Sequence, residues 1–219
     1  MISPERLAAL QASFVQTLSK YAVEPVAAYP IFHRLEAAYG EPHRSYHTFE
    51  HLAEMFKVAS KLADFADDTS AVQLAIWFHD AVYDPRSRDN EERSAAWASE
   101  LLHPVGVPDA ILKHVGAMIR ATAHTDTSDV EGDTAVLLDA DLAILSSEER
   151  RYQRYAADVR REYAWVDDAA YRAGRIKVLE SFLKRPRIYR TARMYDVAEQ
   201  PARQNLTAEI ERLRSNRAL

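Results

Sequence analysis

The sequence predicts an all-α protein built as a compact bundle of many helices. Apolar residues recur with a period near 3.6 along most of the chain, which is typical of amphipathic helices. Only five of the 219 residues are glycine, and 47% are hydrophobic while 28% are charged, an ordinary globular balance. No linker, repeat or low-complexity stretch is evident. We therefore expect one domain over residues 1–219, in which the helices of about 147–219 complete the pocket.

Capping residues and helix breakers set the expected helix boundaries. Ser3-Pro4-Glu5 begins a first helix that runs to about Lys20, with proline at its first position. A second helix runs from about Pro25 to Tyr39 and is ended by Gly40. The other helices are expected from His47 to about Ala66, over Ser70–Val82, after the polar loop Asp84–Asn90, over Asp109–Ile119, around Asp139 beyond the loop Thr125–Gly132, and over Glu148–Tyr163, Asp168–Leu183 and a last segment to about Arg214.

Charge and composition exclude several classes of protein. The net charge of −5 argues against a scaffold that binds nucleic acid by general electrostatics. The absence of cysteine excludes disulfides, thiolate metal sites and a thiol nucleophile. No glycine-rich phosphate loop and no Gly-x-Ser-x-Gly motif is present. No apolar run approaches the ~20 residues of a membrane span, and no targeting segment is evident. We expect a soluble, cytoplasmic protein whose oligomeric state the sequence does not indicate.

The pair His79-Asp80, inside the apolar run Leu74–Val82, is the most informative feature of the chain. Such a run is typical of a buried helix, where an ionised carboxylate is costly unless it has a partner. A divalent metal supplies such a partner, and histidine and aspartate are both ligands for these ions. Alternatively, the pair lies at a helix end, where Asp80 meets solvent or an arginine and His79 is an ordinary core histidine.

Two further segments place histidine or aspartate among apolar residues. His47 and His51 are four residues apart and share one face of the expected helix. Asp139 and Asp141 lie in the run Ala135–Leu145 and point to nearly opposite sides of a helix, at about 100° per residue. One of them therefore faces a given metal, while the other meets a cap, a tyrosine or an arginine. Three segments with the same anomaly favour one shared metal site.

The order His…His-Asp…Asp resembles the HD-domain superfamily of metal-dependent phosphohydrolases. Within it, the chain is most similar to a group of small, mostly bacterial, stand-alone predicted phosphohydrolases, from about Pro42 onward. The resemblance implies a compact HD-like helical bundle and metal-assisted hydrolysis. The matching pieces are Pro42-His-Arg-x-Tyr-His47 with His51, Trp77-Phe-His-Asp-Ala-Val-Tyr83, Asn90-Glu-x-x-Ser-Ala95, Asp139-Ala-Asp-Leu142, Arg160-x-Glu-Tyr163 and Ala202-Arg-x-Asn205.

The expected metal ligands are His51, His79, Asp80 and Asp141. The Ala-Asp-Leu resemblance selects Asp141 over Asp139. Two neutral nitrogens and two carboxylates suit a divalent ion such as Mn²⁺, Fe²⁺, Co²⁺, Ni²⁺ or Zn²⁺, and Mg²⁺ stays within the range of metals considered. The sequence does not say whether one or two ions bind.

His47 and Asp84 are the expected catalytic residues. Tyr46-His47-x-x-x-His51 is similar to the signature of cyclic-nucleotide phosphodiesterases, which implies that His47 acts as an acid; alternatively, it supports a ligand or caps the helix. The stretch from His79 to Asp84 is similar to the His-Asp-x-x-Glu-Asp motif of alarmone hydrolases, with tyrosine in place of glutamate. This implies that Asp84 orients the attacking water, whereas a turn before proline is the alternative.

A phosphate substrate requires local cations that the acidic chain as a whole does not supply. The candidates are Arg44, Arg160 and Arg175, of which Arg44 stands out because it is next to the first histidines. His124, at a helix end, is the better of two further histidines for binding phosphate or a second metal, ahead of His114.

Together these residues predict a metal-dependent phosphohydrolase. It would cleave a phosphate ester or anhydride bond of a nucleotide or related small metabolite. A nucleotide-binding sensor with the same pocket and little turnover is the alternative. A helical protein that uses the metal for stability alone is the third.

Overall fold

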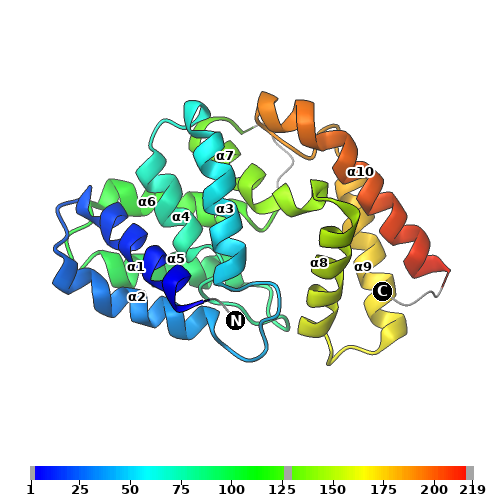
Figure 1. Cartoon of the computed structure of the whole chain (residues 1–219), viewed down its shortest axis with the longest axis horizontal. Helices are drawn as coiled ribbons and strands as arrows, with labels where there is room; N and C mark the ends of the chain where they lie inside the picture. The colour runs from blue at the N-terminus through cyan, green and yellow to red at the C-terminus, as the bar shows by residue number, and fades with distance from the viewer. Residues whose placement is uncertain (1–2, 126–129, 216–219) are drawn as a thin grey trace.

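The computed structural model describes residues 3–125 and 130–215, and within these residues the protein is all-helical (Figure 1). The predicted loop Thr125–Gly132 lies partly outside the described residues. The helices are α1 (Pro4–Ser19), α2 (Pro25–Tyr39), α3 (Phe49–Lys61), η1 (Ala63–Phe65), α4 (Thr69–Phe78), α5 (Asn90–Leu102), α6 (Asp109–Ala121), α7 (Gly132–Leu142), η2 (Ala143–Ser146), α8 (Glu149–Glu162), α9 (Asp168–Leu183) and α10 (Ala192–Arg214). The predicted fold class is confirmed.

The helices α3, α4 and α7 lie at the centre of the molecule. Helix α7 packs against α3, α4 and α6, while α8, α9 and α10 lie at one end of the view in Figure 1. One cluster of buried apolar side chains extends from α1 to α10. Near its middle Trp77 is fully buried and contacts the rings of Phe14, Phe32, Phe49 and Phe56. Because these central helices are fixed by the core, side chains at their ends are held in place.

Helix α3 begins later than the sequence suggested. Thr48 is extended and its hydroxyl accepts from the Glu50 amide at 3.3 Å, so it caps a helix that starts at Phe49. His47 therefore precedes the helix, and the prediction that His47 and His51 share one helix face is wrong. The two rings are still neighbours, with centroids 6.0 Å apart.

Helix α4 ends earlier than the predicted Val82. Its last residue is Phe78, His79 is the C-cap, and Asp80 lies in the following turn. The alternative that this pair lies at a helix end is therefore confirmed. The buried guanidinium of Arg44 donates to the carbonyls of Asp80 at 2.6 Å and Ala81 at 3.1 Å. It satisfies backbone groups that a continuing helix would otherwise pair.

Asp139 ties α7 to the start of α10. Its fully buried carboxylate accepts from the backbone amides of Arg190 and Thr191 and from the Thr191 hydroxyl, each at 2.7 Å. Thr191 in turn caps α10. Asp139 thus meets a cap, which leaves Asp141 to face the other side of α7.

Among the described residues, the structure contains no helix with the length and apolar character needed to cross a bilayer.

Replacing Asp139 with alanine should lower the free energy of unfolding by about 3 kcal/mol, because three buried donors lose their acceptor. Urea denaturation followed by circular dichroism measures this change. The control is Asp196→Ala on the exposed face of α10, which should cost less than about 0.5 kcal/mol. Equal stabilities of the two variants would contradict the proposed role of Asp139.

Candidate metal centre

His51, His79 and Asp141 converge where α3, α4 and α7 meet. His51 Nε2 lies 3.1 Å from Asp141 Oδ1 and 3.3 Å from His79 Nε2, while His79 Nε2 lies 3.8 Å from Asp141 Oδ1. Their ligand atoms all lie within 4.8 Å of one another, a spacing that can hold one metal ion. The two histidines are buried, and the Asp141 side chain is 17% exposed. The group is therefore rigid on its protein side and reachable from solvent.

The orientation of His79 suits a metal ligand. Its Nδ1 lies 3.0 Å from the carbonyl of Ile76, one turn earlier in α4. In the neutral ring this contact places the proton on Nδ1 and leaves the Nε2 lone pair directed at His51 and Asp141. Histidines that bind metals usually donate their other ring N–H to a carbonyl or carboxylate in this way.

Asp80 adjoins the group through His79. Its Oδ2 lies 3.0 Å from His79 Nε2 and 4.0 Å from His47 Nε2. It does not belong to the set whose ligand atoms all lie within 4.8 Å, which consists of His51, His79 and Asp141. Asp80 is thus placed beside an ion at this position, and its role as a direct ligand stays a prediction.

The charges of the group call for a cation. Burial alone would lower the pKa of His79, but the carboxylates of Asp80 and Asp141 outweigh it and raise the pKa to about 9. Burial acts to raise the pKa of Asp141, but hydrogen bonds from His124 and His51 hold it well below its usual value. The carboxylates therefore stay ionised and need positive charge nearby, which either protons or a metal ion provide.

His124 completes the surroundings of Asp141. Its Nε2 lies 2.9 Å from Asp141 Oδ2, on the carboxylate oxygen that does not face His51. Its backbone has a positive φ of 52°, an uncommon conformation that directs the chain out of the turn after α6. His124 was predicted to bind substrate; the structure places it at the site, where it orients a carboxylate.

Glu162, a buried residue at the end of α8, fixes the position of His47. Glu162 Oε1 accepts from the backbone amides of Ser45, Tyr46 and His47 at 2.7, 2.7 and 3.0 Å. Its Oε2 lies 2.6 Å from His47 Nδ1 and accepts from the Tyr83 hydroxyl at 2.9 Å. The contact fixes the ring so that Nε2 faces Asp80.

The same contacts set the protonation of the His47–Glu162 pair. Burial would raise the pKa of Glu162, but His47 and the backbone amides lower it to about 2. For His47, burial acts to lower the pKa, but the carboxylates of Asp80 and Glu162 outweigh it and raise the pKa. His47 is therefore stabilised as the imidazolium, with its second N–H directed toward the metal group.

The sequence analysis missed Glu162. The available signal was its position on the apolar face of α8, because the buried residues of that helix follow a 3.6-residue period that ends on Glu162. These residues are Tyr152, Tyr155, Ala156, Val159 and Glu162.

Two of the arginines predicted to bind phosphate have other partners. Besides the two carbonyls after α4, Arg44 pairs with Glu41 at 3.0 Å, and its side chain is fully buried. Arg160 donates to the carbonyls of Tyr163 and Val166 and pairs with Asp168 at 2.7 Å, within the connection from α8 to α9. Each guanidinium holds a turn of the backbone, and binding of phosphate by either arginine stays a prediction.

Asp84 occupies a turn, as the alternative interpretation had it. It is exposed, and its Oδ1 accepts from the Arg86 amide at 2.9 Å. Asn90 closes the same turn by bonding to the backbone of Asp84 at both its amide and its carbonyl. The carboxylate is engaged in the geometry of this loop, and its predicted role in orienting water stays a prediction.

A cavity of about 640 Å³ adjoins the site and shares two wall residues with it, Tyr83 and Glu162. Tyr83 packs its ring against His47, with centroids 4.3 Å apart. At the other end Trp165 is half-exposed and lies under the guanidinium of Arg86, 5.2 Å from the ring centre. The cavity thus combines aromatic rings and cations next to His47.

The fold and the site define this chain as a helical protein with a candidate His/Asp metal centre. No family model, curated protein or solved structure matches it, so its membership of a particular family stays a prediction.

Metal affinity should rise with pH, because the ion and a proton compete for His79. The pKa of His79 is about 9, so below that pH a metal has to displace a proton. From about pH 6 to about pH 8 the apparent affinity for Mn²⁺ or Zn²⁺ should increase about tenfold per pH unit for each proton that the metal displaces. Titration calorimetry in buffers of different protonation enthalpy measures both quantities. An affinity that does not change with pH would contradict this competition.

Proposed function

We propose that this protein is a metal-dependent phosphohydrolase that cleaves a phosphate ester or anhydride bond of a nucleotide or related small metabolite. The observation that carries the proposal is the pairing of a buried His-His-Asp group with the imidazolium of His47 on its solvent-accessible side. Structural metal sites are normally closed by protein ligands, whereas catalytic sites keep an open position. The partial exposure of Asp80, Asp141 and His47 favours the catalytic kind.

His51, His79 and Asp141, with Asp80 beside them, are the residues that would hold the metal. When bound, the ion supplies Lewis-acid stabilisation of phosphoryl oxygens and lowers the pKa of a coordinated water to about 7. His51 and His79 would fix the position of the ion, because they are buried in the core and cannot move without disturbing it.

His47 would protonate the leaving oxygen. A general acid needs a proton at working pH and a position within reach of the bond that breaks. The raised pKa supplies the first, and the orientation of Nε2 toward Asp80 supplies the second. Glu162 positions the ring and stabilises its charge without reaching the substrate, since its carboxylate oxygens already accept from three amides, His47 and Tyr83.

The cavity next to Tyr83 would accommodate the leaving group. Its volume of about 640 Å³ lies within the usual range of small-molecule sites. Because the ring of Tyr83 contacts His47 and also lines the cavity, a group that leaves toward His47 would enter it. Aromatic and cationic side chains at its mouth favour a planar, anionic group such as a nucleotide.

The test of the proposed function is phosphate release by protein that has been stripped with a chelator and reloaded with single divalent metals. Nucleotides, sugar phosphates and nitrophenyl phosphates form the substrate set. Asp141→Ala should lose activity and weaken metal binding by roughly 100-fold or more, because even indirect contacts to a metal ligand are worth 10–100-fold. His33→Ala, which removes an exposed histidine, is the control and should change neither. Binding of nucleotides without turnover under every metal would contradict the enzyme and favour a sensor.

His47→Ala should retain the metal while the catalytic rate falls by roughly 10²–10⁴. The loss should be smaller for nitrophenyl esters, because good leaving groups need little protonation.

Glu162→Gln should lower the pKa of His47 by removing a negative charge, and so should move the basic limb of the pH–rate profile to lower pH. Rates and profiles are measured at saturating metal. Loss of metal from His47→Ala, or an unchanged rate with every substrate, would exclude His47 as the acid.

A further inference from the structure

The arginines that the sequence analysis proposed for a phosphate all have partners within the protein. Arg44 and Arg160 hold backbone turns. The late-helix candidate Arg175 pairs with the buried carboxylate of Glu209 at 2.8 Å. Each of these guanidinium groups is compensated by protein, so each would have to give up a protein partner to bind an anionic ligand. A cation without such a partner would bind an anion at lower cost.

Arg185, in the connection from α9 to α10, is buried and has no carboxylate partner among the described residues. The residue is 9% exposed, and its Nη2 donates to the carbonyl of His124. Its guanidinium lies 4.3 Å from the centre of the Phe182 ring. Within residues 3–125 and 130–215, no carboxylate forms an ion pair with it. A buried charge that lacks a counterion is costly, and here the charge of Arg190 adds to the cost, since burial and Arg190 both lower the pKa of Arg185.

Arg185 lies next to the candidate metal group, because both contact His124. Its partner His124 carries the ring that contacts Asp141 at 2.9 Å. The Phe182 ring packs against both residues, with its centroid 5.9 Å from that of His124. His124 therefore connects Arg185 to Asp141, a predicted metal ligand. Its backbone carbonyl accepts from Arg185, and its ring contacts the Asp141 carboxylate.

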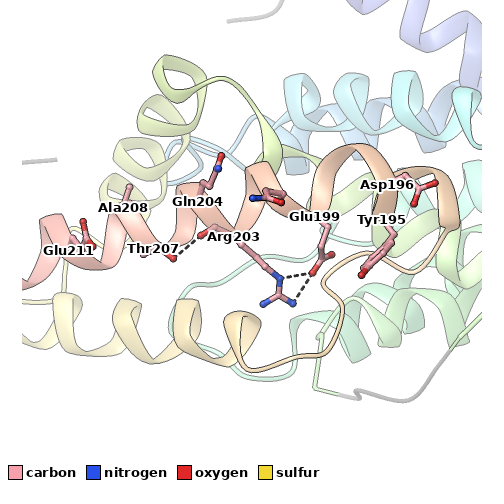
Figure 2. A pocket seen from close by; sticks show the side chains of 9 residues that line it. Tyr195, Asp196, Glu199, Arg203, Gln204, Thr207, Ala208 and Glu211 are labelled. Carbon is pink, nitrogen blue, oxygen red and sulfur yellow. Dashed lines mark hydrogen bonds and ion pairs between the residues drawn. The ribbon is translucent and has the colours of Figure 1, made fainter.

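The backbone around Arg185 is fixed by an ion pair on α10, between Arg203 and Glu199. Arg203 donates to the carbonyls of Leu183 at 2.9 Å and Arg185 at 2.7 Å. Glu199 accepts from the amides of Ile188 and Tyr189 and pairs with Arg203, as Figure 2 shows for the last contact. The guanidinium of Arg185 is thus held in place by the fold and is not a mobile surface arm.

We propose that Arg185 binds a phosphate group, on the His124 side of the metal group. The identity of this anion as a phosphate of the substrate rests on the proposed function. The chemistry is that of a planar guanidinium in a desolvated position, which binds phosphate oxygens through paired hydrogen bonds. This role explains why the protein keeps a buried cation that the described residues leave without a carboxylate.

Arg185→Met tests the proposal, with Arg187→Met as the matched control. Arg187 is two residues away in the same segment, carries the same charge, is exposed and lies over the Tyr195 ring. The probe is inorganic phosphate added to chelator-treated protein at constant ionic strength, followed by calorimetry and thermal melting. Wild-type protein and Arg187→Met should bind phosphate, while Arg185→Met should bind it at least about tenfold more weakly. Without phosphate, the melting temperature of Arg185→Met should equal or exceed that of the wild type.

Phosphate binding by Arg185→Met at wild-type strength would overturn the proposal, as would a wild-type protein that does not bind phosphate at all. If Arg185→Met does not fold, Arg185→Gln carries the test, because it can still donate to the His124 carbonyl but lacks the charge. The two proposals fail separately. Arg185-dependent phosphate binding by a protein that binds no metal would overturn only the proposed function, whereas metal-dependent hydrolysis with an unchanged KM in Arg185→Met would overturn only the role of Arg185.

Discussion

Buried carboxylates must be compensated, and this constraint determines how the helices of this protein are joined. Among the described residues, four of them accept hydrogen bonds from the backbone amides of other segments: Asp133 from residues 67 and 68, Asp139 from residues 190 and 191, Glu162 from residues 45 to 47, and Glu199 from residues 188 and 189. Each satisfies donors that irregular backbone would otherwise leave unpaired. The connections next to the site are therefore as well defined as the helices.

Asp80 and Asp141 differ from these four carboxylates. Among the described residues, the side chains that pair with them are histidine rings: His79 and His47 for Asp80, and His51, His79 and His124 for Asp141. An imidazole can release its proton near neutral pH, whereas a backbone amide cannot. The compensation of these two carboxylates can therefore be exchanged for a metal ion, whereas the backbone amides that the other four accept cannot release their protons. This separates the site from the scaffold on physical grounds.

The sequence predicted the helices well because their apolar periodicity and caps are local properties. It also singled out His51, His79 and Asp141, since polar groups in apolar runs stand out without knowledge of the fold. It placed His47 on a helix because the backbone contacts of Glu162, more than a hundred residues away in the chain, leave no local trace. Arg44 and Asp84 were assigned to chemistry for the same reason, as their partners are backbone groups that appear only once the chain has folded. Spacing identifies a site, but hydrogen-bond partners decide which side chains are free to act.

The two histidines next to Asp80 show how the partner decides the role. His79 directs Nδ1 at a neutral carbonyl, so its positive charge is supported mainly by the carboxylates on its Nε2 side. A metal ion that takes over those carboxylates removes the reason for the proton. His47 directs Nδ1 at the ionised carboxylate of Glu162, which is anchored by three amides. The charge of His47 therefore keeps a counterion even when Asp80 is neutralised. His79 is suited to exchange its proton for a metal ion, while His47 retains its proton.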